Sequence, residues 1–169
     1  MEQGEGQSSK DIETNTDTTR RSIPHFFQEE VRARVLSARI LVVEDFAPFL
    51  QFISTTLATR HDLQVICEVS DGLEAVRKAE ELRPDLILLD IGLPSLNGIE
   101  AARQIRKLVP ESKIIFLTQE SSDEVVEEAF RLGACGYVKK IQAKRDLLAA
   151  VETVISGKQF VSSTSDNGN

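Results

Sequence analysis

The stretch LILLDIGLP, residues 86–94, decides the fold because an unbroken aliphatic run ends directly in a carboxylate. Four aliphatic residues without polar alternation are typical of a strand that is buried on both faces of a parallel sheet. An ionised carboxylate at the end of such a strand is costly to bury unless a cation or hydrogen-bond donors accompany it. Asp90 is therefore the first candidate for a functional residue.

Strand-like and helix-like patterns alternate five times between residues 39 and 161. Each apolar, strand-like run is followed by a segment with apolar residues at helical spacing; the runs are RILVVED, LQVICEVS, DLILLD, SKIIFLTQ and GYVKK. Such alternation is typical of a parallel sheet with helices on both faces. The sequence therefore predicts a doubly wound α/β domain with three layers.

Composition narrows the class of protein. The chain has 169 residues, 41% of them hydrophobic, which suits one domain with polar flanks. A net charge of -7 argues against a general nucleic-acid binder, which usually carries a basic face. No apolar stretch approaches the roughly 20 residues that span a membrane. We expect a cytoplasmic protein without a membrane partner, with Cys67 and Cys135 as reduced, structural residues.

The segments outside the domain differ in pattern. Residues 1–21 and 162–169 are polar and almost free of large apolar residues, so we expect disordered tails there. Residues 22–38, SIPHFFQEEVRARVLSA, carry an apolar stripe with a spacing of four and predict an extra N-terminal helix. That helix would either pack on the domain as a linker or present a face to a partner, and its pattern leaves both open.

Polar residues follow the predicted strands at the points where they end. The first strand ends in Glu44 and Asp45, the third in Asp90, the fourth in Thr118, and the fifth in the pair 139–140. Because the carboxyl ends of parallel strands meet at one edge of the sheet, these groups are expected to converge. Each has an ordinary explanation by itself, as a helix cap, a strand end or a surface lysine. Their joint placement favours a site.

The chemistry of this set points to phosphate and a metal ion. Carboxylates that lie close together raise each other's pKa unless a cation sits among them. Mg²⁺ prefers oxygen ligands and often binds one or two carboxylates together with phosphate. A carboxylate can also attack phosphorus to form an aspartyl phosphate, while a lysine and a hydroxyl contact the phosphoryl oxygens. These residues predict phosphate transfer to Asp90 with Mg²⁺ as cofactor.

Residues from Arg39 to about Ser163 resemble the receiver domain of two-component response regulators. The resemblance is carried by ILVVED, LILLDIGLPSLNGIE, IIFLTQE and GACGYVKK. It implies a (βα)5 flavodoxin-like fold with strand order 2-1-3-4-5. It also implies a place in a phosphorelay, with a sensor histidine kinase or a phosphotransfer protein as the phosphoryl donor.

The resemblance further assigns roles within the site. Asp90 would be the phosphoacceptor. Mg²⁺ would be held by Glu44, Asp45 and Asp90, with Asp45 the closer of the acid pair and the backbone carbonyl of Gly92 completing the protein ligands. Such a receiver phosphorylates and dephosphorylates itself and is not otherwise an enzyme. A haloacid-dehalogenase-type phosphatase would need a second aspartate at position 92, where this chain has glycine.

Three residues would carry the signal onward in a protein that resembles receivers. Thr118 would contact the phosphoryl group, and Lys140 rather than Lys139 matches the family lysine because it lies three residues after Tyr137. Tyr137 would exchange between exposed and inward positions together with Thr118. This switch would act on the surface of the fourth helix, fifth strand and fifth helix, for an unknown downstream partner or a homodimer formed on phosphorylation.

Two further stretches bear on the output. DIGLPSLNGIEAARQIR and ISGKQFVSS resemble receivers of the nitrate-regulator type, which precede a helix-turn-helix domain. No helix-turn-helix fits in the residues that follow them, so we expect no nucleic-acid binding by this chain alone. The sequence favours a stand-alone receiver; the alternative is a piece of a longer DNA-binding transcription regulator.

Overall fold

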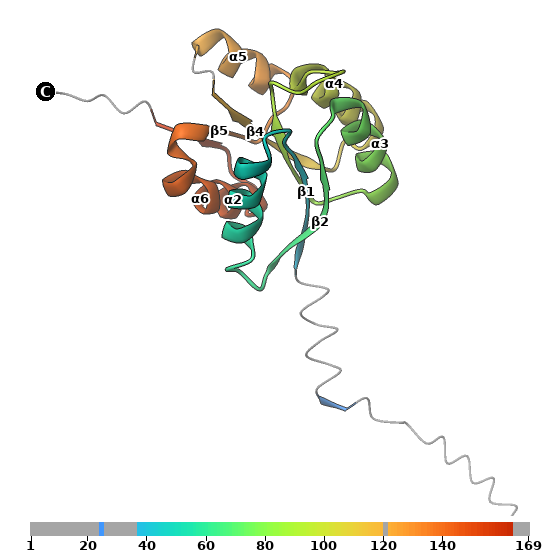
Figure 1. Cartoon of the computed structure of the whole chain (residues 1–169), viewed down its shortest axis with the longest axis vertical. Coiled ribbons are helices and arrows are strands. Elements are labelled where there is room, and N and C mark those ends of the chain that lie inside the picture. Colours follow the sequence, from blue (N-terminus) through green and yellow to red (C-terminus); the bar gives the residue numbers. More distant parts are fainter. Residues whose placement is uncertain (1–23, 26–36, 120–121, 164–169) are drawn as a thin grey trace, which may run out of the picture.

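The computed structural model describes residues 24–25, 37–119 and 122–163. From residue 38 on, they form a parallel sheet between helices (Figure 1). The strands are β1 (Ala38–Val43), β2 (Leu63–Val69), β3 (Leu86–Asp90), β4 (Lys113–Thr118), β5 (Gly136–Lys139) and β6 (Phe160–Val161). The helices are α2 (Ala47–Leu57), α3 (Gly72–Leu82), α4 (Gly98–Leu108), α5 (Asp123–Arg131) and α6 (Ala143–Ile155), with a short 3₁₀ turn, η1 (Lys140–Gln142). Among these described residues, no helix is both long and apolar enough to cross a membrane.

The strand order is β2-β1-β3-β4-β5-β6, and every pairing is parallel. The predicted doubly wound order 2-1-3-4-5 is confirmed for the first five strands. The prediction lacked the sixth strand, which pairs with β5 through Gly136 opposite Phe160 and Tyr137 opposite Val161. A strand of two residues is too short to produce a recognisable alternation, which explains why it was missed.

Helices cover both faces of the sheet, as the alternation predicted. In Figure 1, α2 and α6 lie on one side, and α3, α4 and α5 lie on the other. Successive residues of the central strands point to opposite sides: Ile40 belongs to the same buried cluster as Ile53 of α2, whereas Leu41 belongs to the cluster that contains Ile105 of α4. The aliphatic residues 86–89 of β3 are fully buried, which confirms a central strand covered on both faces.

Local interactions fix the start of two helices near the site. The Asp71 carboxylate accepts a hydrogen bond from the backbone amide of Leu73 at 2.8 Å, so this residue caps the start of α3. Asn97 caps α4 by accepting from the Glu100 amide at 2.9 Å. The next residue, Gly98, packs so tightly that a Cβ atom there would lie 2.0 Å from the carbonyl oxygen of Asp90. The start of α4 therefore supports the backbone of the candidate acceptor.

A buried polar cluster joins β6 to β5 and α6. The Ser162 amide donates to the Tyr137 carbonyl at 2.9 Å, and its hydroxyl donates to Asp146 at 2.7 Å. The same hydroxyl accepts from the Lys139 amide at 3.2 Å. Ser162 is thus a buried part of the fold, although its polar surroundings in the sequence predicted a tail over residues 162–169. Residues 164–169, the tail 1–21 and most of the predicted helix 22–38 lie outside the described residues, and β1 already begins at Ala38.

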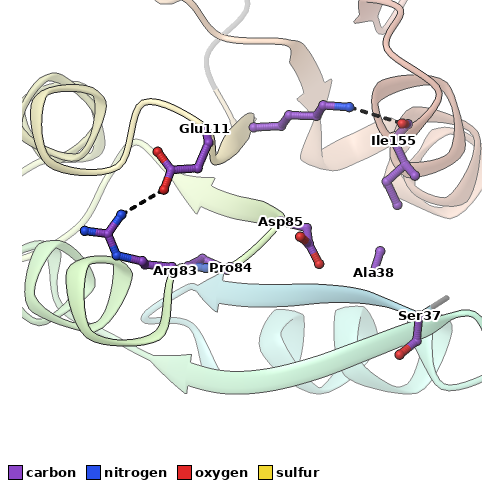
Figure 2. A pocket seen from close by; sticks show the side chains of 8 residues that line it. Ser37, Ala38, Arg83, Pro84, Asp85, Glu111 and Ile155 are labelled. Atoms are coloured by element: carbon purple, nitrogen blue, oxygen red, sulfur yellow. Dashed lines mark hydrogen bonds and ion pairs between the residues drawn. The ribbon is translucent and has the colours of Figure 1, made fainter. Parts of the chain in front are cut away.

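A surface hollow with a volume of about 430 Å³ lies at the amino ends of the strands (Figure 2). Its polar groups are engaged by one another: Arg83 pairs with Glu111 at 2.8 Å, and the Lys113 ammonium donates to the Ile155 carbonyl at 3.1 Å. Asp85 accepts from a backbone amide of β1 at 2.7 Å. These contacts hold the loops at this edge to one another and to the C-terminal end of α6. The hollow is therefore part of the scaffold.

Candidate functional site

The opposite edge of the sheet gathers the predicted acids. Asp90 is the last residue of β3, and Glu44 and Asp45 directly follow β1. The three residues offer carboxylate oxygens that lie within 4.8 Å of one another. Because β1 pairs with β2 on one side and β3 on the other, this is the point where the strand order reverses, and ligands of such sheets bind there.

Lys140 connects the two buried acids. Its ammonium nitrogen lies 2.7 Å from Glu44 Oε2 and 3.1 Å from Asp90 Oδ2. The side chain of Glu44 is fully buried and that of Lys140 is only 12% exposed. Lys139, the other lysine at the end of the fifth strand, is the last residue of β5 and pairs with Thr118 in the sheet. The structure therefore brings Lys140, the predicted lysine, to the acids.

The pKa of Glu44 is raised although an ammonium lies beside its carboxylate. Burial raises the pKa of this carboxyl, and the nearby Asp90 charge raises it further. The hydrogen bond from Lys140 and the bond from the Phe46 amide, 3.0 Å from Oε1, act in the opposite direction. The cluster holds three acids, of which Lys140 pairs with two, so it keeps an excess of negative charge and an all-oxygen donor set. This arrangement fits Mg²⁺, which Glu44, Asp45 and Asp90 would hold.

Backbone groups around Asp90 complete the site. The Gly92 amide donates to Asp90 Oδ1 at 3.2 Å, which places residue 92 beside the Asp90 carboxylate; a role of the Gly92 carbonyl as a metal ligand stays a prediction. An open pocket of about 330 Å³ lies over these groups. Its lining combines the acids with the ends of the neighbouring strands: Asp45, Phe46, Asp90, Ile91, Gly92, Thr118, Gln119 and Lys140.

The two predicted switch residues are both buried. Thr118 ends β4, lines the pocket and is 2% exposed. Tyr137 is fully buried and belongs to the core between the sheet and the layer of α3, α4 and α5, together with Phe116 and Ala129. The structure thus holds Tyr137 in the inward position. An exchange to an exposed position remains a prediction.

One residue at the site was missed as a functional residue. The ring of Phe49, in the first turn of α2, has its centroid 5.0 Å from the Lys140 ammonium. The helical spacing of the segment after the acid pair predicts only an apolar position at Phe49. The position of Phe49, one helical turn after the acid pair, could have indicated that it lies near the site. Its contact with Lys140 could not be predicted, because the two residues are far apart in the sequence and no local pattern links them.

Comparison with known proteins identifies the family. The model of the response regulator receiver domain matches residues 40–152, a span that contains every residue of the site just described. The chain belongs to the response regulator receiver family. Response regulators receive phosphate from sensor kinases, and their receiver domains bind Mg²⁺ at an acidic pocket. This family is a signalling family and not a classical enzyme family.

Relatives and solved structures agree with this assignment. The response regulator protein VraR of Staphylococcus aureus is 35% identical over 123 residues, a match that covers 73% of this chain and 59% of VraR. A LuxR-family two-component response regulator from Aurantimonas sp. SI85-9A1 is 31% identical, with a TM-score of 0.70 over 73% of this chain and 89% of that one. The response regulator domain of Thermotoga maritima CheB is 32% identical, with a TM-score of 0.66 over 71% and 97%. The chain spans about 59% of the length of the curated relative.

Proposed function

We propose that this receiver accepts a phosphoryl group on Asp90, from a sensor histidine kinase or a phosphotransfer protein, in a Mg²⁺-dependent reaction. One observation carries the proposal: a buried lysine bridges Asp90 and Glu44 at 3.1 and 2.7 Å, inside a cluster of three acids. A lone structural aspartate needs neither the second acid nor the third. A phosphoacceptor benefits from both, because the further acids would hold Mg²⁺, and Mg²⁺ and the lysine together neutralise the charge on the phosphoryl oxygens during transfer.

The residues would divide the work as follows. An Asp90 carboxylate oxygen attacks phosphorus, the bond from phosphorus to the donor imidazole breaks, and the imidazole keeps the bonding electrons. The Lys140 ammonium, already at the acceptor, neutralises the new charge, and Thr118 at the rim of the pocket offers its hydroxyl to a phosphoryl oxygen. Mg²⁺, held by Glu44, Asp45, Asp90 and the Gly92 carbonyl, would supply further neutralisation when bound.

The output would be a change in protein contacts on the face formed by α5, β5 and α6. Thr118 and Lys139 are paired across β4 and β5, so a movement of the threonine toward the phosphate would act on β5 directly. Tyr137 lies two residues earlier on the same strand and would follow. A downstream protein or a second copy of the receiver would bind the altered face. Size-exclusion chromatography with and without phosphorylation distinguishes the two.

A second candidate is that the receiver is one part of a longer DNA-binding transcription regulator. The observation that favours it is the coverage of VraR, of which the match spans 59%. A reading frame that continues into a helix-turn-helix, together with operator binding by the encoded protein, would support this candidate. The phosphoacceptor role of Asp90 is the same in both cases.

Acetyl phosphate, a small phosphoryl donor, tests the phosphoacceptor function without a kinase. The protein is incubated with acetyl phosphate and Mg²⁺, and its intact mass is measured for the wild type, Asp90→Ala and the exposed-residue control Asp62→Asn. We expect one added phosphoryl group in the wild type and the control, and none in Asp90→Ala or in the presence of EDTA. Phosphorylation of Asp90→Ala to the wild-type extent would overturn the proposal.

A further inference from the structure

The ammonium of Lys140 has an aromatic neighbour as well as its two acids. It lies 2.7 Å from Glu44 Oε2, 3.1 Å from Asp90 Oδ2 and 5.0 Å from the centroid of the Phe49 ring. The negative face of an aromatic ring attracts a cation within about 6 Å of its centroid. The attraction is strongest when the cation is removed from water, and the Lys140 side chain is only 12% exposed.

We propose that Phe49 is a positioning residue that keeps the Lys140 ammonium beside Asp90 through the face of its ring. The proposal rests on the phosphoacceptor function of Asp90 and extends it to a residue of α2. Phe49 does not touch the reacting atoms; it acts through the lysine that does.

The ring is itself held in place, as a positioning residue must be. Phe49 stacks on Phe52, with 5.6 Å between ring centroids and 27° between ring planes. Both rings pack against the core between the sheet and the layer of α2 and α6. The aromatic face is therefore presented to Lys140 by a fixed surface, and little conformational freedom is lost when the ammonium settles on it.

The contact matters because the metal ion and the Lys140 ammonium would compete for the carboxylates of Glu44 and Asp90. Glu44 and Asp90 are also the residues that would hold Mg²⁺, so a bound metal shares their oxygens with the ammonium. The Phe49 ring offers no oxygen ligand, and its attraction for Lys140 persists when the carboxylates are shared. Without the ring, a flexible four-carbon side chain would leave the acceptor more often, and transfer to Asp90 would slow.

Phe49 also belongs to the core, so packing must be separated from positioning. Phe49→Leu keeps an apolar side chain and removes the aromatic face, whereas Phe49→Tyr keeps the face. Phe52→Leu is the matched control, because it removes the stacked partner ring and a similar amount of core packing. Thermal unfolding of all variants reports the cost of packing by itself.

The kinetic test is the rate of phosphorylation by acetyl phosphate at saturating Mg²⁺. We expect Phe49→Leu to slow phosphorylation roughly three- to tenfold, the range that loss of a largely buried cation–π contact implies. Phe49→Tyr is expected to stay within about twofold of the wild type, since it keeps the aromatic face. Phe52→Leu loosens the Phe49 ring but keeps that ring and its face, so it should slow phosphorylation clearly less than Phe49→Leu. An unchanged rate in Phe49→Leu, or equal slowing in Phe52→Leu, would overturn the proposal.

A double-mutant cycle tests the contact without phosphorylation or metal. Urea unfolding in EDTA is measured for the wild type, Phe49→Leu, Lys140→Met and the double variant. We expect Phe49→Leu to change the unfolding constant several-fold less when Lys140 is already replaced, and additive effects would refute the contact. If the cycle shows coupling but the wild type takes up no phosphoryl group, the phosphoacceptor function fails and the positioning role falls with it.

Discussion

Replacing Lys140 with methionine removes the cation that the structure places between Glu44 and Asp90. The ammonium lies 2.7 and 3.1 Å from their carboxylate oxygens, and both acids are buried. Loss of one partner from a buried ion pair leaves uncompensated charge and costs about 3–5 kcal/mol. Methionine retains most of the length and the apolar stem of lysine, so this cost is mainly electrostatic.

The cost should depend on pH in a direction that the structure fixes. Burial raises the pKa of Glu44 above its ordinary value of 4.5, and the lysine opposes that shift, so its removal raises this pKa further. The folded state then binds a proton more readily than the unfolded state, and the free energy of unfolding falls as pH rises through the raised pKa. Lys140→Met should therefore be much less destabilising at pH 5 than at pH 8.

Urea unfolding of the wild type, Lys140→Met and Lys139→Met at the two pH values is the assay. The Lys139 variant changes the same charge at the end of β5, away from the ion pair, and should lose little at either pH. Addition of Mg²⁺ at tenfold over its dissociation constant should restore about 1.4 kcal/mol to Lys140→Met at pH 8. A loss of stability that is equal at both pH values, or equal in the two variants, would refute this reasoning.

Three further predictions concern the scaffold of the domain. Asp146→Asn should destabilise the protein at neutral pH, because hydrogen bonds from Arg145 and Ser162 lower the pKa of the Asp146 carboxyl. The stabilisation from the ionised carboxylate is full above about pH 4 and is lost as pH falls through the lowered pKa. The melting temperatures of the variant and the wild type should therefore converge in acid. Gly98→Ala should prevent folding or phosphorylation, since its Cβ atom would lie 2.0 Å from the Asp90 carbonyl oxygen. Gly157→Ala, with nothing within 4 Å but a φ of +88°, should cost only about 1 kcal/mol in urea unfolding.

The sequence was sufficient for most of the fold because its signals are local. The run of residues 86–89 has no polar alternation, and the structure buries all four of them between two helical layers. The start of α3 also has a local signal, since Asp71 lies directly before the helix and its side chain caps it. The short strand β6 carried no such signal. Its place depends on Ser162 and Asp146, which meet only once α6 has folded back against β5.

The site was predictable in composition but not in geometry. Parallel strands deliver Glu44, Asp90 and Lys140 to one edge by topology alone, so their convergence followed from the alternation of elements. That the lysine lies closer to Glu44 than to Asp90 depends on side-chain packing, which no spacing rule contains. For the same reason Phe49 read as an ordinary apolar position of α2, although its ring also faces the ammonium.

Chemical location of the phosphoryl group tests the central claim most directly. Borohydride reduces an aspartyl phosphate to homoserine, so protein treated with acetyl phosphate and Mg²⁺ is reduced, digested and mapped by peptide mass spectrometry. Phosphorylation of the buried acceptor predicts homoserine at position 90 and unmodified aspartate at position 45. Homoserine at position 45, or a phosphoryl group that resists borohydride and lies on another type of residue, would contradict the account.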